Sequence, residues 1–178
     1  MSDEERISKI KAVIGVYPDY PKPGINFRDI FPVLRNAELL EDLVALLVEQ
    51  IKNQVPDVDV IVGLEARGFL FGPLVAQKLG IGFVPIRKKG KLPGECCQVS
   101  YTLEYGTDVF EAQKDSIKPG QKVVIIDDLL ATGGTMSAAC QLVEKLKGRA
   151  CLCVVVIELV DLKGSAKFTI PSFSLVQI

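Results

Sequence analysis

The chain has 178 residues and a hydrophobic content of 48%, enough for one well-buried domain and too little for two of ordinary size. Its 21 basic and 22 acidic residues nearly cancel, which excludes the strongly basic surface of a nucleic-acid-binding protein and any comparable attraction to membranes. The N-terminus is charged and no apolar run is long enough to span a bilayer. We therefore expect a soluble cytoplasmic protein without nucleic-acid or membrane partners.

Helical and strand-like segments alternate along most of the chain. The expected elements of the first half are, in order, a helix over 3–16, a proline-rich loop over 17–24, a helix over 36–53 with Asn36 as its N-cap, a strand over 58–63, a helix over 68–79 and a strand over 83–87. They are followed by a basic loop over 88–94, a hairpin or flap over 97–113, a buried strand over 123–126, a helix that Thr135 caps and that ends near Lys147 with Gly148 as its C-terminal cap, and strands over 152–159 and 173–176. This alternation predicts one α/β domain, residues 1–178, with a central mostly parallel sheet flanked by helices.

The chain contains no histidine and five cysteines. Without histidine, Ser-His-Asp and Cys-His catalysis are excluded, and any general acid or base must be Asp, Glu, Lys, Tyr or Cys. Cys151 and Cys153 lie two positions apart in an apolar run, and we interpret both as buried thiols on one face of a strand. No role is predicted for Cys96 and Cys97, which belong to an expected loop.

The segment from Val123 to Thr135 reads VVIIDDLLATGGT and is the most informative in the chain. Its continuous apolar run is typical of a strand buried on both faces of a parallel sheet, and ligands bind beyond the carboxyl ends of such strands. Asp127 and Asp128 fall there, as acceptors for sugar hydroxyls. The turn over 131–135 offers backbone N–H groups at the start of a helix, which suits a phosphate. Together these features predict a ribose 5-phosphate site.

Two other phosphate-binding loops are excluded. A P-loop requires a lysine after its second glycine, and Thr135 follows Gly134 here. A dinucleotide-binding fingerprint also fails, because no third glycine follows Gly80 and Gly82 at the required spacing.

The complete string instead resembles the phosphoribosyl pyrophosphate (PRPP) motif of type I phosphoribosyltransferases. Four further segments resemble the adenine phosphoribosyltransferases within that family and lie in the family's order; they are PKPGINFRDI at 21–30, GLEARGFLFGP at 63–73, RKKGKLPG at 87–94 and SYTLEYG at 100–106. The resemblance covers essentially the full length, is close to the animal enzymes and includes DLKG at 161–164. It implies the type I fold with a small N-terminal hood, about 1–35, and a flexible flap, about 94–113.

The resemblance implies roles for two groups of residues at the ribose phosphate. The PRPP site would comprise Asp127, Asp128, Ala131, Thr132, Gly133, Gly134 and Thr135, and the pyrophosphate site Glu65, Ala66, Arg67, Arg87, Lys88 and Lys91. Glu65–Ala66 would be a cis peptide, and Arg87 would reach the site of a neighbouring subunit in a homodimer. Taken alone, Arg67 could be a surface side chain and the run from Arg87 to Lys91 a solvated charge cluster.

At the base, the resemblance implies that Asn26, Phe27, Arg28 and Leu129 bind adenine and that Glu104 and Tyr105 on the flap are catalytic. Phe27 would stack on the purine, Arg28 would donate to a ring nitrogen, and the backbone at Asn26 would read the 6-amino group. Phe31 departs from the Thr or Ser that is usual in the family. Mg²⁺ is the expected cofactor, held mainly through the substrate's pyrophosphate and water, with no direct protein ligand.

The resemblance therefore implies a purine salvage enzyme that transfers the 5-phosphoribosyl group from PRPP to adenine and releases AMP and pyrophosphate. Two alternatives remain at this point. One is the same chemistry on hypoxanthine, guanine or orotate. The other is a PRPP-sensing regulator that has kept the fold but binds nucleic acid or a partner.

Overall fold

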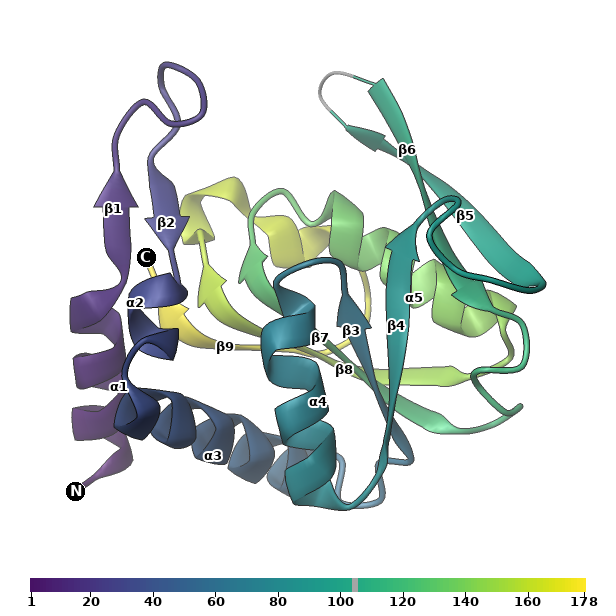
Figure 1. Ribbon diagram of the computed structural model, residues 1–178, viewed down its shortest axis with the longest axis horizontal. Helices are drawn as coiled ribbons and strands as arrows, with labels where there is room; N and C mark the ends of the chain where they lie inside the picture. The colour runs from purple at the N-terminus through teal and green to yellow at the C-terminus, as the bar shows by residue number, and fades with distance from the viewer. Residues whose placement is uncertain (104–105) are drawn as a thin grey trace. The chain divides into compact units, whose positions relative to one another are not determined.

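The computed structural model describes residues 1–103 and 106–178, which form two compact units, residues 1–47 and 48–178 (Figure 1). Its elements in chain order are α1 (Asp3–Val13), β1 (Gly15–Tyr17), β2 (Phe27–Asp29), α2 (Phe31–Leu34), α3 (Ala37–Gln54), β3 (Val60–Leu64), α4 (Gly68–Leu79), β4 (Gly82–Lys88), β5 (Cys96–Leu103), β6 (Gly106–Gln113), β7 (Lys122–Leu130), α5 (Gly134–Lys145), β8 (Arg149–Glu158), the 3₁₀ turns η1 (Val160–Leu162) and η2 (Gly164–Lys167), and β9 (Ser172–Gln177). Among the described residues, no helix combines the length and the apolar character needed to cross a membrane.

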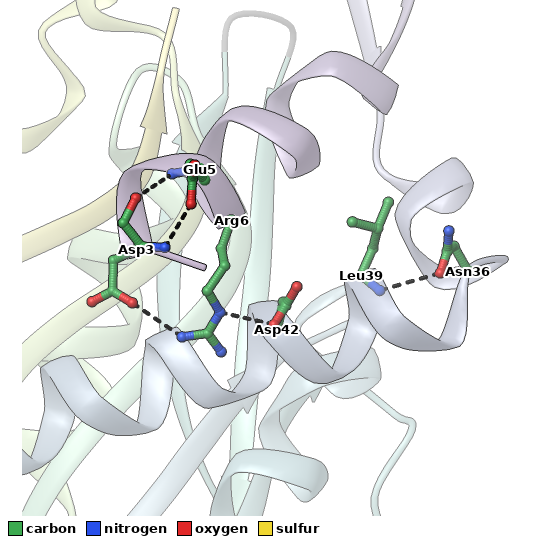
Figure 2. A network of polar contacts seen from close by, with 7 residues as sticks. Asp3, Glu5, Arg6, Asn36, Leu39 and Asp42 are labelled. Carbon is green, nitrogen blue, oxygen red and sulfur yellow. Dashed lines mark hydrogen bonds and ion pairs between the residues drawn. The ribbon is translucent and has the colours of Figure 1, made fainter.

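Polar contacts join α1 to α3 in the first unit (Figure 2). The guanidinium of Arg6 donates through Nε to Oδ1 of Asp42 at 2.8 Å and forms a second ion pair with Asp3. The N-terminus of α3 is capped by Asn36, whose Oδ1 accepts from the backbone N–H groups of Glu38 and Leu39 at 3.0 and 3.3 Å. The predicted N-cap at Asn36 is thus confirmed.

The first helix is shorter than predicted. It ends at Val13 because Ile14 adopts extended backbone angles, and the next three residues form β1 instead of a further helical turn. β1 pairs with β2 in antiparallel register, with Gly15 opposite Asp29. A Cβ at Gly15 would lie 3.1 Å from Cβ of Asp29, so glycine lets the two strands approach closely.

The second unit is built on a seven-stranded sheet in the order β5-β6-β4-β3-β7-β8-β9. The five strands from β4 to β9 run parallel, and β5 and β6 form an antiparallel hairpin at one edge. Figure 1 shows α4 and α5 on opposite faces of this sheet, as right-handed crossovers in opposite directions require. The predicted α/β class and mostly parallel sheet are therefore confirmed.

The central strand β7 is buried as its apolar run predicts, and residues 123–126 have no exposed surface. However, Asp127 and Asp128 lie within β7 and not after it. The pairing of β7 with β3 ends at Ile126, whereas its pairing with β8 continues to Leu130. Because β3 stops first, the two carboxylates lie beside an opening on one side of β7.

The ends of α5 differ from the prediction. Gly133 is the N-cap, in left-handed conformation with φ of 82°, and Thr135 is the second helical residue without a capping side-chain bond. At the C-terminus Lys147 adopts the left-handed conformation, with φ of 65°, and Gly148 follows it. Their N–H groups donate to the carbonyls of Glu144 and Val143 at 2.8 and 3.0 Å, as in a Schellman motif.

The cysteine prediction is partly wrong. Cys153 is buried, but Cys151 is half-buried. Cys140 on α5 is also buried, and its Sγ lies 3.5 Å from Sγ of Cys153.

Candidate active site

A cavity of about 390 Å³ lies at the carboxyl ends of β3, β4 and β7, next to the β5–β6 hairpin. Eleven of the predicted site residues line this cavity: Glu65, Ala66, Arg67, Lys88, Asp127, Asp128, Leu129, Ala131, Thr132, Gly133 and Thr135. Gly134, which was also predicted, lies between two of these lining residues in the sequence. Arg87 and Lys91 are outside this lining. Five residues that sequence reasoning missed also line the cavity, namely Tyr101, Asp108, Phe110, Leu130 and Met136.

The paired carboxylates form the buried wall of the cavity. Asp128 is only 3% exposed, and its Oδ2 lies 2.8 Å from Nε of Arg67. Oδ1 of Asp127 accepts from the backbone N–H of Asp128 at 2.9 Å. Burial raises the pKa of Asp127 well above its usual value, and the adjacent charge of Asp128 raises it further. Burial also raises the pKa of Asp128, against the opposing effect of Arg67.

Gly68 permits the close approach of α4 to this wall. A Cβ on Gly68 would lie 2.6 Å from the carbonyl oxygen of Ile126 and 3.4 Å from Oδ1 of Asp127. The helix N-terminus therefore rests directly on β7, and Arg67, one residue earlier, is placed against Asp128. The preceding peptide, Glu65–Ala66, is cis, as the resemblance implied.

The turn after β7 also contributes to the lining of the cavity. Residues 131–133 and Thr135 line it, and α5 begins there with the left-handed Gly133. The first-turn N–H groups of a helix lack carbonyl partners within the helix, and the helix dipole makes this end positive. The turn thus presents backbone donors of the kind that suit a phosphate group, and the phosphate site stays a prediction.

Glu65 accepts several hydrogen bonds from the end of β4. Its carboxylate accepts from Nε and Nη2 of Arg87 at 3.2 and 3.0 Å and from the backbone N–H of Lys88 at 2.9 Å. The hydrogen bond from Arg87 is the main cause that lowers the pKa of Glu65. Nη1 of Arg87 also donates to the carbonyl of Lys91 at 3.2 Å. The guanidinium thus organises the basic loop of its own chain.

A cluster that was not predicted joins the hairpin to β4. Nζ of Lys88 lies 2.9 Å from Oδ2 of Asp108, and the hydroxyl of Tyr101 donates to the same oxygen at 3.4 Å. Burial, with a contribution from Asp108, raises the pKa of Tyr101 to about 12. Lys88 lowers the pKa of Asp108. Tyr101 and Asp108 are register partners in the hairpin, so its register was the signal that could have brought them together.

The remaining adenine-site candidates belong to the first unit, residues 1–47, whereas the cavity lining belongs to the second. Phe27 packs edge-on against Tyr20, with ring centroids 5.2 Å apart. The Nε of Arg28 is buried without a hydrogen-bond partner among the described residues. Asn26 is exposed, and so is Phe31, at 44%. Glu104 and Tyr105 lie outside the described residues.

We expect Glu65→Gln to reduce the free energy of unfolding by about 1–2 kcal/mol at neutral pH, because two charge-assisted hydrogen bonds from Arg87 are weakened. The lowered pKa of Glu65 means that this stabilisation is complete above the unfolded-state pKa of about 4.3 and is lost as the pH falls through the folded-state value. Urea unfolding at neutral and acid pH measures the difference, which should shrink in acid. Glu95→Gln, in an exposed pair with Lys114, is the matched control. Equal stability of wild type and Glu65→Gln at neutral pH would mean that the hydrogen bonds from Arg87 to Glu65 do not stabilise the fold.

The geometry corresponds to a known class of protein. The family model described as "Phosphoribosyl transferase domain" matches residues 34–168, which include every residue that lines the cavity. The fold and this site therefore define a phosphoribosyltransferase.

Full-length relatives narrow the assignment. An adenine phosphoribosyltransferase of Drosophila pseudoobscura pseudoobscura is 51% identical over 177 residues, covering 99% of this chain and 98% of the relative. The Homo sapiens adenine phosphoribosyltransferase is 49% identical over 179 residues and 99% of both chains. The chain belongs to the adenine phosphoribosyltransferase family.

Solved structures agree with this assignment. The Saccharomyces cerevisiae adenine phosphoribosyltransferase, in complex with an imino-altritol bisphosphate and adenine, has a TM-score of 0.95 at 44% identity, covering 97% of this chain and 99% of that one. The Trypanosoma brucei enzyme, in complex with AMP, pyrophosphate and ribose 5-phosphate, has a TM-score of 0.89 at 29% identity, covering 97% and 79%.

Proposed function

We infer that this chain catalyses purine salvage: it transfers the 5-phosphoribosyl group of PRPP to adenine and releases AMP and pyrophosphate. The observation that carries this inference is one cavity lined by a buried carboxylate pair, by the turn that begins α5 and by the cations Arg67 and Lys88. Relatives of the same family hold adenine, AMP, pyrophosphate and ribose 5-phosphate. Adenine is one substrate of the proposed reaction, ribose 5-phosphate and pyrophosphate are parts of the other, and AMP and pyrophosphate are its products.

We propose that the ribose phosphate occupies β7 and the turn after it. Asp127 and Asp128 would accept hydrogen bonds from the ribose hydroxyls, and residues 131–135 would bind the 5-phosphate. In the reaction the bond from C1 of ribose to the pyrophosphate oxygen breaks, and a bond from C1 to a ring nitrogen of adenine forms with loss of its proton. Positive charge develops on the sugar, as in glycoside chemistry, and the buried carboxylates favour it. Holding both substrates in line lowers the activation barrier by about 7–11 kcal/mol in well-oriented systems.

The pyrophosphate would leave toward Glu65, Ala66, Arg67 and Lys88. Arg67 and Lys88 line the cavity and carry the charge that the leaving group needs, whereas Arg87 and Lys91 support the loop from outside. Lys88 is paired with Asp108, so pyrophosphate would compete with that carboxylate for the ammonium group. Arg67 is paired with Asp128, so it links the pyrophosphate end to the ribose end.

We propose that Mg²⁺ is held mainly through pyrophosphate oxygens and water. Three carboxylates that line the cavity, Glu65, Asp108 and Asp128, are already paired with cations of the chain. Mg²⁺ retains several waters and is usually bound by substrate phosphates with one or two carboxylates. Bound in this way, the ion would neutralise charge that develops on the leaving pyrophosphate.

The base would be held by the hood, about residues 1–35, and enclosed by the flap, about residues 94–113. The buried, unpaired Nε of Arg28 supports this proposal, because a buried donor without an acceptor is costly and a ring nitrogen of adenine would satisfy it. Phe27 would stack on the ring, Leu129 would contact it from the cavity wall, and the backbone at Asn26 would accept from the 6-amino group. Glu104 and Tyr105 on the flap would act on the base and close the site.

We also propose a cytoplasmic homodimer, on the family resemblance alone. Arg87 is bonded to Glu65 of its own chain, so a role in a neighbour's site requires that it exchange this carboxylate for pyrophosphate. Sedimentation that shows a fully active monomer would remove the shared-site proposal.

The decisive assay measures pyrophosphate release from PRPP in the presence of Mg²⁺, with adenine, hypoxanthine, guanine and orotate in parallel. We expect release with adenine alone, accompanied by AMP, because a fixed carbonyl accepts from a 6-amino group and repels a 6-oxo group. Release with another base would keep the phosphoribosyl chemistry and overturn the specificity. PRPP binding without release in any sample would indicate a regulator.

A further inference from the structure

The proposed phosphate-binding turn, residues 131–135, packs against a second segment of backbone at Gly164. A Cβ on Gly133 would lie 2.0 Å from the carbonyl oxygen of Gly164, and a Cβ on Gly164 would lie 2.2 Å from the carbonyl oxygen of Ala131. Real Cβ atoms do not approach other atoms so closely. The two glycines therefore bring two stretches of main chain into direct contact, with no side chain between them.

Gly164 is well placed to support this turn without taking part in it. It is buried at the start of η2, which packs against α5 (Figure 1). Gly164 does not line the cavity, whereas Ala131 and Gly133, the residues it touches, both do. Its own φ lies outside the left-handed region, so the need for glycine here comes from close approach alone.

The segment that carries Gly164 is anchored where it begins, at Leu159 and Val160. The N–H of Leu159 donates to the carbonyl of Leu130 at 3.0 Å, and that of Val160 donates to the carbonyl of Ile178 at 3.1 Å. Lys163 turns the chain in left-handed conformation, with φ of 49°, and its carbonyl accepts from Ala166 at 3.1 Å. A rigid turn fixed to the end of β7 can set the position of the loop that continues from the same strand.

We propose that Gly164 is a positioning residue for the 5-phosphate of the substrate: the turn over 161–164 holds residues 131–133 in the conformation that directs their backbone at the phosphate. This role explains the DLKG segment, which the proposed reaction leaves without a function. It rests on the proposed function, because it assumes that the turn after β7 binds the ribose phosphate.

The role differs from that of other tightly packed glycines in this unit. Gly63 and Gly72 would each place a Cβ within 2.6 Å of the ring of Phe83, so they accommodate a core side chain. Gly164 instead meets the main chain of the phosphate-binding turn. Substitution of Gly164 should therefore weaken binding of the 5-phosphate end of PRPP more than binding of its pyrophosphate end.

The test compares Gly164→Ala with Gly82→Ala, at a glycine of β4 with nothing within 4 Å of its Cβ position. Calorimetry measures binding of ribose 5-phosphate and, separately, of pyrophosphate with Mg²⁺. We expect Gly164→Ala to weaken ribose 5-phosphate by about 10- to 100-fold, since small displacements of a positioning group have effects of this size, and to leave pyrophosphate nearly unchanged. In turnover assays the KM for PRPP should rise more than kcat falls.

Three results would overturn the inference or its basis. Unchanged ribose 5-phosphate binding by a folded Gly164→Ala would remove the positioning role. Equal weakening of both ligands, with a lower melting temperature, would reduce it to a general packing role. A wild-type protein that does not bind ribose 5-phosphate at all would instead overturn the proposed function.

Hydrogen exchange on the wild type decides the question even if Gly164→Ala does not fold. We expect ribose 5-phosphate to slow exchange at residues 131–136 and 162–166 together, because the two segments form one packed unit, and pyrophosphate to leave residues 162–166 unchanged. Protection confined to residues 131–136 would contradict the inference.

Discussion

Asp127→Asn is expected to reduce turnover by about 10²–10³-fold and at the same time to raise the melting temperature at neutral pH. Turnover falls because the buried carboxylate is proposed to accept from a ribose hydroxyl and to stabilise positive charge on the sugar. Stability rises because burial and the adjacent charge of Asp128 disfavour the ionised form of Asp127. The amide that replaces it carries no charge to bury.

The stability gain should depend on pH in a defined direction. The pKa of Asp127 is raised in the folded protein, so between the unfolded-state and folded-state values the folded protein binds more protons. Wild-type stability therefore falls as the pH rises through this interval, and the asparagine variant escapes that loss. The difference in melting temperature should be smallest in acid and largest above the folded-state pKa.

Melting curves between acid and neutral pH, combined with rates of AMP formation, test both expectations. Asp115→Asn, at an exposed aspartate in the turn after β6, is the control and should change neither quantity. A lower melting temperature of Asp127→Asn at every pH would mean that the hydrogen bond from the N–H of Asp128 outweighs the cost of the buried charge.

Local sequence patterns predicted the parts of the site that depend on one strand and the turn that follows it. The apolar run and the Thr/Gly turn were enough to place Asp127, Asp128 and the turn over 131–135 together, because a buried strand followed by a helix positions these groups without help from distant residues. The limits of α5 were not predicted, since the left-handed N-cap at Gly133 faces Gly164, some thirty residues later along the chain. A sequence pattern read over a few residues does not contain that contact.

The contacts within the β5–β6 hairpin were likewise not contained in a local sequence pattern. Its existence was predicted, but Tyr101 and Asp108 were missed because their meeting depends on the register of β5 against β6. A shift of one residue would turn both side chains to the other face. Similarly, the end of α1 at Val13 follows from the pairing of β1 with β2, which overrides a helical apolar pattern that continues to Ile14.

Glu104→Gln is the second substitution with a large expected effect, a loss of about 10²–10⁴-fold in turnover with PRPP binding retained. The reasoning begins from the chain's lack of histidine: another group must take the proton that adenine loses. Tyr101 is unsuitable, because a pKa of about 12 keeps its hydroxyl protonated at neutral pH. Asp108 is a weak base, because Lys88 lowers its pKa.

Two further carboxylates of the cavity are engaged by arginines: Arg87 lowers the pKa of Glu65, and Asp128 is paired with Arg67. The candidates that we compare are therefore Glu104 on the flap and Asp127 in the cavity wall. Asp127 has the raised pKa that a base needs, but it is proposed to bind the ribose, whereas the family resemblance directs Glu104 at the purine. Rates of AMP formation across pH, with PRPP affinity measured separately, distinguish the two. We expect Glu104→Gln to lose the acid limb of the pH–rate profile, and Glu95→Gln, at an exposed glutamate just before β5, to behave as wild type. If Glu104→Gln keeps both its rate and its acid limb, the proton must pass to Asp127, and the flap would serve only to exclude water.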